Sequence, residues 1–97
     1  MFARVSTIQG KPEQVEDSIR NYRELVVPMV QKMAGFKGAD LLVDRKSGKL
    51  VGITCWDTEK NLQAGTATAD RLRAQASQTA GAAKPPTVEI YEVAIEV

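Results

Sequence analysis

The sequence predicts a single α+β domain whose strands and helices follow in the order βαββαβ, a ferredoxin-like arrangement. Two apolar runs, Ala39–Val43 and Leu50–Trp56, flank a connection rich in Lys, Ser and Gly, which is typical of a β-hairpin. A long apolar stripe with helical spacing precedes this hairpin, and a second helix start follows it directly. A strand at each end of the chain completes the order. With 97 residues, we expect one domain, residues 1–97.

The first third of the chain predicts one strand and one long helix. Phe2–Ile8 alternates as a strand does, and Pro12 is well placed in the first turn of a helix. The helix is expected to run to about Met33 because apolar residues recur every three or four positions. Pro28 lies inside it and removes a backbone donor, so we expect a kink or a break there.

The second helix is expected to begin at Asp57 or Thr58 and to end near Thr79. Its inward stripe consists mostly of small residues: Leu62, Gly65, Ala69, Leu72 and Ala76. Such a helix either packs very close to the sheet or leaves room beside it. The last strand is expected over Thr87–Val97, with a phase slip near Tyr91 that suggests a β-bulge.

The strands are apolar on both faces, which predicts a homodimer. Neighbouring hairpin residues that point to opposite faces are both apolar, as in Leu41 and Leu42. Two helices cover only one face of a four-stranded sheet. The other face would leave a large apolar patch in water, so we expect a second copy to cover it with two-fold symmetry.

Composition argues against several kinds of site. The 13 basic and 12 acidic residues leave no footprint for nucleic acid or an anionic membrane. The absence of histidine removes His-dependent triads, His-ligated zinc or iron, and proximal-His haem. The single cysteine, Cys55, favours a reducing cytoplasm, and no segment is long enough to span a bilayer. We expect a cytoplasmic protein with no metal site and no nucleic-acid or membrane partner.

The chain resembles the antibiotic biosynthesis monooxygenase family, which belongs to the dimeric α+β barrel group. The resemblance covers nearly the whole chain and rests on the βαββαβ order and three segments: Gly35-Phe36-Lys37-Gly38, Trp56-Asp57-Thr58-Glu59 and Val88-Glu89-Ile90-Tyr91-Glu92-Val93. It implies a homodimer through the sheet face, with one pocket per subunit between sheet and helices. Some members oxidise polyketide aromatics with dioxygen and no metal or flavin; others degrade haem, and others have no established activity.

The resemblance carries over only part of the family's site. Trp56 matches the Trp that lines the pocket of quinone-forming members. The pocket Asn, Tyr and Arg of those members fall at Gly52, at Leu62 and near Ala76. After a shift along the helix, Arg71 or Arg73 could replace the Arg.

The haem-degrading branch is a poorer match. Its haem-binding His falls near Gln75, so haem degradation by the usual ligation is not expected. Thr7 is the rough counterpart of the first-strand Asn of that branch. The resemblance therefore implies an activity without a cofactor.

Two functions remain open. The first is a cofactor-independent monooxygenase that acts on a small polyketide- or quinol-like aromatic in a dry pocket. The second is a non-catalytic homodimer that binds a small molecule or only dimerises. A cavity with a Tyr or Arg tip in it favours the enzyme, and a filled interior favours the dimerisation module.

Six residues form the predicted site. Trp56 and Tyr22 are the catalytic candidates, and Thr7, Met29, Met33 and Arg73 are the substrate-binding candidates. A structural role is open for five of them: the aromatic residues as core residues, the methionines as filling, and the arginine as a solvated helix charge. In a pocket, Tyr22 would be the acid–base group and an inward arginine would bind a phenolate or a carboxylate.

Overall fold

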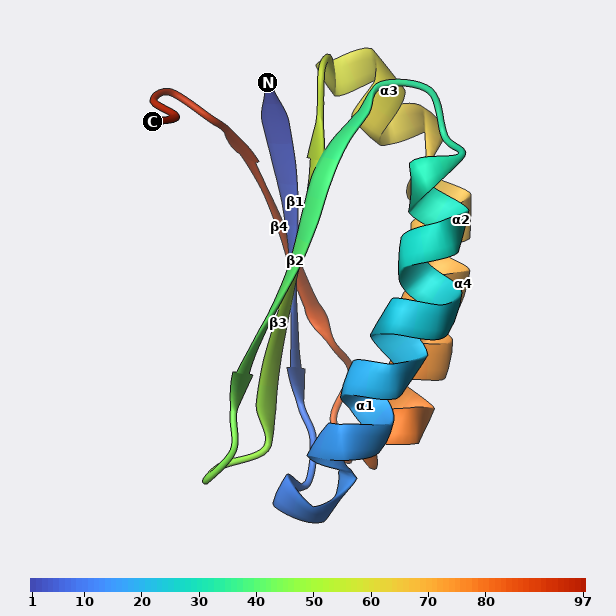
Figure 1. Cartoon of the computed structure of the whole chain (residues 1–97), viewed down its shortest axis with the longest axis vertical. Helices are drawn as coiled ribbons and strands as arrows, with labels where there is room; N and C mark the ends of the chain where they lie inside the picture. Colours follow the sequence, from blue (N-terminus) through green and yellow to red (C-terminus); the bar gives the residue numbers. More distant parts are fainter.

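All 97 residues are described by the computed structural model, in which a four-stranded antiparallel sheet carries every helix on one face (Figure 1). The strands are β1 (Phe2–Gln9), β2 (Phe36–Asp44), β3 (Lys49–Trp56) and β4 (Thr87–Glu92). They lie in the order β2-β3-β1-β4, and each neighbouring pair is antiparallel. The predicted α+β class and the ferredoxin-like βαββαβ order are confirmed. No helix has the length and apolar character needed to cross a membrane.

The first helical region consists of four successive pieces rather than one uniform helix. They are the 3₁₀ turn η1 (Pro12–Gln14), α1 (Val15–Asn21), the π-helical segment η2 (Tyr22–Val26) and α2 (Val27–Gln31). The backbone amide of Val27 donates to the carbonyl of Tyr22, five residues back. This wider turn directly precedes Pro28 and accommodates its missing donor and its ring. The interruption predicted at Pro28 therefore takes the form of a π-bulge.

The second helix was expected to be continuous, but it is divided at Gly65 into α3 (Glu59–Ala64) and α4 (Thr66–Ala80). Thr58 caps α3 as predicted, because its Oγ1 accepts a hydrogen bond of 3.1 Å from the Asn61 amide. A Cβ atom at Gly65 would lie 2.6 Å from the Cε of Met33. The division therefore coincides with a close approach of this backbone to the first helical region.

The last strand is shorter than predicted. β4 ends at Glu92 and pairs with β1 without a register shift, so the bulge expected near Tyr91 is wrong. The physical reason is the start of β1: Phe2 already pairs with Glu92, and beyond it only the Met1 carbonyl accepts from the Val93 amide. The sheet has its irregularity in β2 instead, between Phe36 and Gly38.

The layer between sheet and helices holds two apolar clusters. One consists of Val26, Val30, Trp56 and Leu62, and the other of Ile8, Leu50 and Ala80. Trp56 pairs with Phe2 at one end of the strands, whereas Leu50 pairs with Ile8 near the other end. The middle of the layer is therefore left to other side chains.

The opposite face of the sheet carries no helix (Figure 1). The strand register places Val5, Ile53 and Val51 on this open face, beside Leu42 of β2. Leu42 is 54% exposed. The open face thus carries apolar residues, as the sequence predicted, but Asp40 and Glu89 lie on it as well.

Candidate functional site

A cavity lies between sheet and helices, in the middle of the layer that separates the two clusters. The volume of this cavity that the centres of water molecules can occupy is about 90 Å³. That is room for several water molecules, since roughly 10–15 Å³ of such space holds one. The strands contribute Arg4, Ser6, Leu41, Leu50, Gly52 and Thr54 to its wall.

The small residues of the second helical region are the reason that this space exists. Four residues of the predicted inward stripe line the cavity: Gly65, Ala69, Leu72 and Ala76. The fifth, Leu62, is fully buried in the cluster around Trp56. Of the two outcomes predicted for this stripe, the structure therefore has the open one.

Tyr22 crosses the layer from η2 and lines the cavity. Its hydroxyl donates to the Asp40 carbonyl at 3.0 Å, with the Ile53 carbonyl at 3.4 Å. Burial, with smaller contributions from Asp40 and Cys55, raises the pKa of Tyr22 to about 12. The hydroxyl therefore stays protonated at neutral pH, which suits a hydrogen-bond donor and not a general base.

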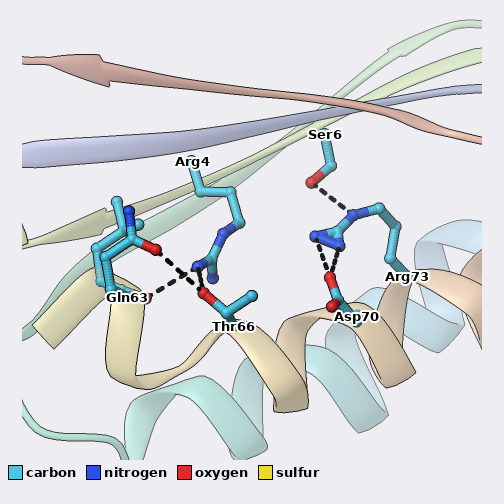
Figure 2. Close-up of polar contacts among 7 residues, drawn as sticks. Arg4, Ser6, Gln63, Thr66, Asp70 and Arg73 are labelled. Carbon is cyan, nitrogen blue, oxygen red and sulfur yellow. Dashed lines mark hydrogen bonds and ion pairs between the residues drawn. The ribbon is translucent and has the colours of Figure 1, made fainter.

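Arg73 points inward from α4 and is 8% exposed (Figure 2). Its Nη1 and Nη2 lie 3.0 and 3.3 Å from Oδ1 of Asp70, and its Nε donates to the Ser6 hydroxyl at 3.3 Å. Burial lowers the pKa of Arg73, and the Asp70 carboxylate opposes that shift. Of the two candidate arginines, Arg73 lines the cavity, whereas Arg71 is exposed and borders a second, separate pocket.

Arg4 is the residue that sequence reasoning missed. It lies on β1, lines the cavity and is only 4% exposed. Its Nη2 donates to the Leu62 carbonyl at 2.9 Å and to Oγ1 of Thr66 at 3.0 Å, while Nε and Nη1 donate to no protein group (Figure 2). No carboxylate lies within ion-pair distance of Arg4. Burial, followed by the charge of Arg73, lowers its pKa.

A sequence signal for Arg4 does exist. Strand alternation places Arg4 on the same face as Phe2 and Ile8, both of which pack in the core layer. A guanidinium on such a face has to be buried, and burying a charge is costly. The alternation alone therefore marks Arg4 as a residue with a special role.

Ser18 of α1 adds a buried hydroxyl to the cavity wall. Its Oγ has no hydrogen-bond partner, and neither has Oγ of Ser77, which is not part of the wall. A buried hydroxyl without a partner costs free energy. At the cavity wall, that cost falls away when a ligand offers a partner.

The structure brings only part of the predicted site together. Tyr22, Met33 and Arg73 line the cavity, whereas Trp56, Thr7 and Met29 do not. Thr7 pairs with Val51 on the open face of the sheet. Met29 is exposed and borders the second pocket beside Arg71.

Trp56 lies behind the cavity wall and is 1% exposed. Its ring meets the Phe36 ring edge-on, with centroids 5.8 Å apart and an interplanar angle of 76°. Its indole Nε1 donates to Oγ1 of Thr54 at 3.1 Å, and Thr54 does line the cavity. Trp56 thus contacts the cavity only indirectly, through its hydrogen bond to Thr54.

Comparison with curated proteins gives relatives in Mycobacterium tuberculosis. The uncharacterized protein Rv2557 of strain H37Rv is 33% identical over 94 residues, which is 97% of this chain and 41% of that protein. The uncharacterized protein Rv2558 of the same strain is 32% identical over 96 residues, covering 98% of this chain and 39% of that protein. The chain therefore spans about two fifths of the length of these relatives.

Comparison with solved structures gives the same fold. A monooxygenase from the gene ActVA-Orf6 of Streptomyces coelicolor, solved in complex with the ligand nanaomycin D, has a TM-score of 0.77 and 20% identity. That match covers 99% of this chain and 89% of the other. An antibiotic biosynthesis monooxygenase with 26% identity has a TM-score of 0.73, and the match covers 98% and 100% of the two chains.

A family model describes most of the chain. The model for antibiotic biosynthesis monooxygenase matches residues 1–77, which include β1 to β3 and most of α4. All the cavity residues named above lie within this range. The chain belongs to the antibiotic biosynthesis monooxygenase family.

Proposed function

We propose that this protein is a monooxygenase that oxidises a small aromatic substrate with dioxygen and without a metal or flavin. The observation that carries the proposal is the cavity itself: apolar on most of its wall, but with Arg4, Arg73 and Tyr22 reaching it. Such a mixture is typical of a small-molecule site, where apolar walls hold the ligand and a few polar groups orient it. The family of the chain and the ligand-bound monooxygenase of the same fold support this proposal.

The proposed reaction converts a phenol into a quinone. A phenol and one dioxygen molecule give a quinone and one water, so one oxygen atom enters the product and the other leaves as water. The substrate supplies all four electrons, and no external reductant is required. Loss of the phenol proton makes the ring electron-rich enough to donate to dioxygen, so the protein has to favour the phenolate.

The residues have separate roles in this proposal. The guanidinium groups of Arg4 and Arg73 stabilise the developing oxyanion. Tyr22 stays protonated, since its raised pKa excludes it as a base, and it lines the wall with its hydroxyl held by the Asp40 carbonyl. Met33, with the apolar strand and helix residues around it, holds the ring and excludes water. Trp56 fixes Thr54 in the wall.

We also propose that the protein is a homodimer formed through the open face of the sheet. Leu42 and Tyr91 are 54% and 50% exposed, and Val5, Val51 and Ile53 lie on the same face. Covering such a surface with a second copy removes apolar area from water. A reducing cytoplasm is the proposed location, since the single cysteine, Cys55, is free.

Oxygen uptake tests the proposed activity. Purified protein, stripped of metals, is incubated in air with a panel of hydroxylated naphthalenes and anthracenes, and oxygen consumption is followed with quinone absorbance. Ala76→Leu adds volume to the cavity wall, whereas Ala74→Leu makes the same change at an exposed position of α4. We expect uptake that Ala76→Leu abolishes and Ala74→Leu leaves unchanged. Equal rates in both variants would place the reaction elsewhere.

A specific observation favours a second candidate, a binding protein without turnover. No carboxylate lines the cavity, and the chain has no histidine, so the wall supplies no conventional general base. In this alternative the same aromatic binds in the cavity but consumes no oxygen. Saturable binding with unchanged oxygen levels over the whole panel would favour it over the monooxygenase.

A further inference from the structure

We propose that the ligand of the cavity carries an oxyanion and that Arg4 is the residue that selects for it. This inference deepens the proposed function and rests on the cavity being the ligand site. It assigns the ligand class, a small aromatic with a phenolate or carboxylate group, and it assigns the specificity-determining residue. Neither assignment depends on whether the bound ligand is oxidised.

The first step is to compare the two inward arginines. Arg73 already has a counter-ion, because its Nη1 and Nη2 contact Asp70 and its Nε contacts Ser6 (Figure 2). Arg4 has no such partner, although it is the more deeply buried of the two. The charge of Asp70 balances that of Arg73. One positive charge therefore remains beside the cavity, and Arg4 carries it.

The second step concerns the free part of the Arg4 guanidinium. Nη2 is occupied by a main-chain carbonyl and a hydroxyl, both of them neutral acceptors. A guanidinium has five N–H groups in a fixed fork, and the groups on Nε and Nη1 have no protein acceptor here. The free N–H groups of Nε and Nη1 point to different sides of the guanidinium, so each of them can donate to one oxygen of a carboxylate or phenolate.

The third step is the fixed direction of the side chain. The Leu62 carbonyl belongs to α3, and Thr66 begins α4, so Arg4 is held at the break between these helices. Figure 2 shows its guanidinium in the layer between β1 and the helices, on the same side of the sheet as that of Arg73. A buried cation that is held in place requires no rearrangement to receive an anion, which is the condition for strong selection.

A calorimetric and spectroscopic binding experiment tests the inference. The carboxylate arm compares 2-naphthoate with neutral 2-naphthamide by isothermal titration, under nitrogen so that no oxidation occurs. The phenolate arm compares 4-nitrophenol with 4-nitroanisole and follows the phenolate absorbance as pH is varied. Each anion is expected to bind about ten- to a hundredfold more tightly than its neutral analogue. Protein is also expected to lower the apparent pKa of 4-nitrophenol.

Three variants assign the preference to a residue. Arg4→Met keeps the length of the side chain but removes its charge, and it is expected to abolish the preference for the anion. Arg4→Lys keeps the charge without the fork and is expected to retain part of it. Arg71→Met, at an exposed position of α4, is the matched control and is expected to retain all of it. If an Arg4 variant does not fold, the comparison of anion with neutral analogue on the wild-type protein still tests the preference for an oxyanion.

The outcomes separate this inference from the proposed function. If the anion is preferred in just one of the two arms, the inference is supported, and that arm shows whether the ligand group is a carboxylate or a phenolate. Equal affinity for anion and neutral analogue, a preference that survives Arg4→Met, or no binding of any probe up to about 1 mM would overturn it. Anion preference without oxygen uptake would contradict the monooxygenase alone, and uptake without anion preference would contradict the role of Arg4 alone.

Discussion

The indole Nε1 of Trp56 donates a hydrogen bond of 3.1 Å to Oγ1 of Thr54, and only Thr54 reaches the cavity. The one tryptophan of the chain therefore supports the site from behind. Its contribution is expected to appear first in stability and only second in ligand binding.

Trp56→Phe is expected to lower the free energy of unfolding by roughly 1–3 kcal/mol, because it removes buried volume and leaves Thr54 without its donor. Affinity for a cavity ligand is expected to change less than threefold. Urea denaturation and a ligand titration on the same sample measure both quantities. Thr54→Val is the control that removes the hydrogen bond alone. A large loss of affinity with unchanged stability would make Trp56 a ligand contact.

The effect of Tyr22→Phe on the free energy of unfolding is expected to depend on pH. Burial raises the pKa of Tyr22 from 10.0 to about 12, so the folded protein holds this proton more tightly than the unfolded chain. The stabilisation is complete below pH 10 and is lost as pH rises through 12, by up to about 2 kcal/mol. Unfolding free energies of wild type and Tyr22→Phe, measured between pH 9 and 12, are therefore expected to converge. A constant difference over this range would show an unshifted tyrosine.

Arg4→Met is expected to leave the free energy of unfolding unchanged or to raise it by up to about 2 kcal/mol. Replacing a buried charge without a counter-ion by an apolar side chain of similar length removes a desolvation cost. The Leu62 carbonyl keeps the Gly65 amide as a donor, at 3.2 Å, so it does not become unpaired. Thermal unfolding of wild type and variant measures this. A loss of several kcal/mol would show that Arg4 holds the fold together, not the ligand.

Ser18 and Ser77 form a matched pair, since both have a buried Oγ without a partner. Alanine at either position is expected to change the free energy of unfolding by less than about 1 kcal/mol, because no hydrogen bond is lost. Only Ser18→Ala is expected to weaken ligand binding, since only Ser18 lines the cavity. Parallel titrations of both variants decide this, and equal effects would remove Ser18 from the site.

Leu42→Lys tests the proposed dimer. Leu42 is 54% exposed on the open face, so a lysine there costs the folded protomer little but puts charge into the proposed interface. Sedimentation velocity is expected to show a dimer for wild type and a protomer for the variant. Gln31→Lys, exposed at the end of α2, is the control. A wild-type protein that sediments as a protomer would refute the homodimer.

The sequence was sufficient for the fold because its signals are local. Strand alternation, the apolar stripe of the first helical region and the cap at Thr58 each predict an element from adjacent residues. The end of β4 is different, since it depends on where β1 begins, ninety residues earlier in the chain (Phe2 pairs with Glu92). The break at Gly65 likewise coincides with the close approach of Met33, which is distant in sequence.

The site was less predictable for the same reason. The alternation of strand residues places both Arg4 and Trp56 on the face that the helices cover. Their positions along the strands then decide that Arg4 lines the cavity and Trp56 belongs to an apolar cluster. That Arg73 has Asp70 as its counter-ion follows from their spacing on one helix. That Arg4 has none becomes visible only when β1 and the break between α3 and α4 are brought together.

The central claim is that the cavity binds an aromatic oxyanion and that dioxygen oxidises it there. The most direct measurement is the ratio of dioxygen consumed to quinone formed by metal-free protein, with a phenol that is shown to bind. The account predicts one dioxygen for each quinone, at a rate that collapses in Arg4→Met and persists in Arg71→Met. A bound phenol that consumes no oxygen, or equal rates in both variants, would contradict it.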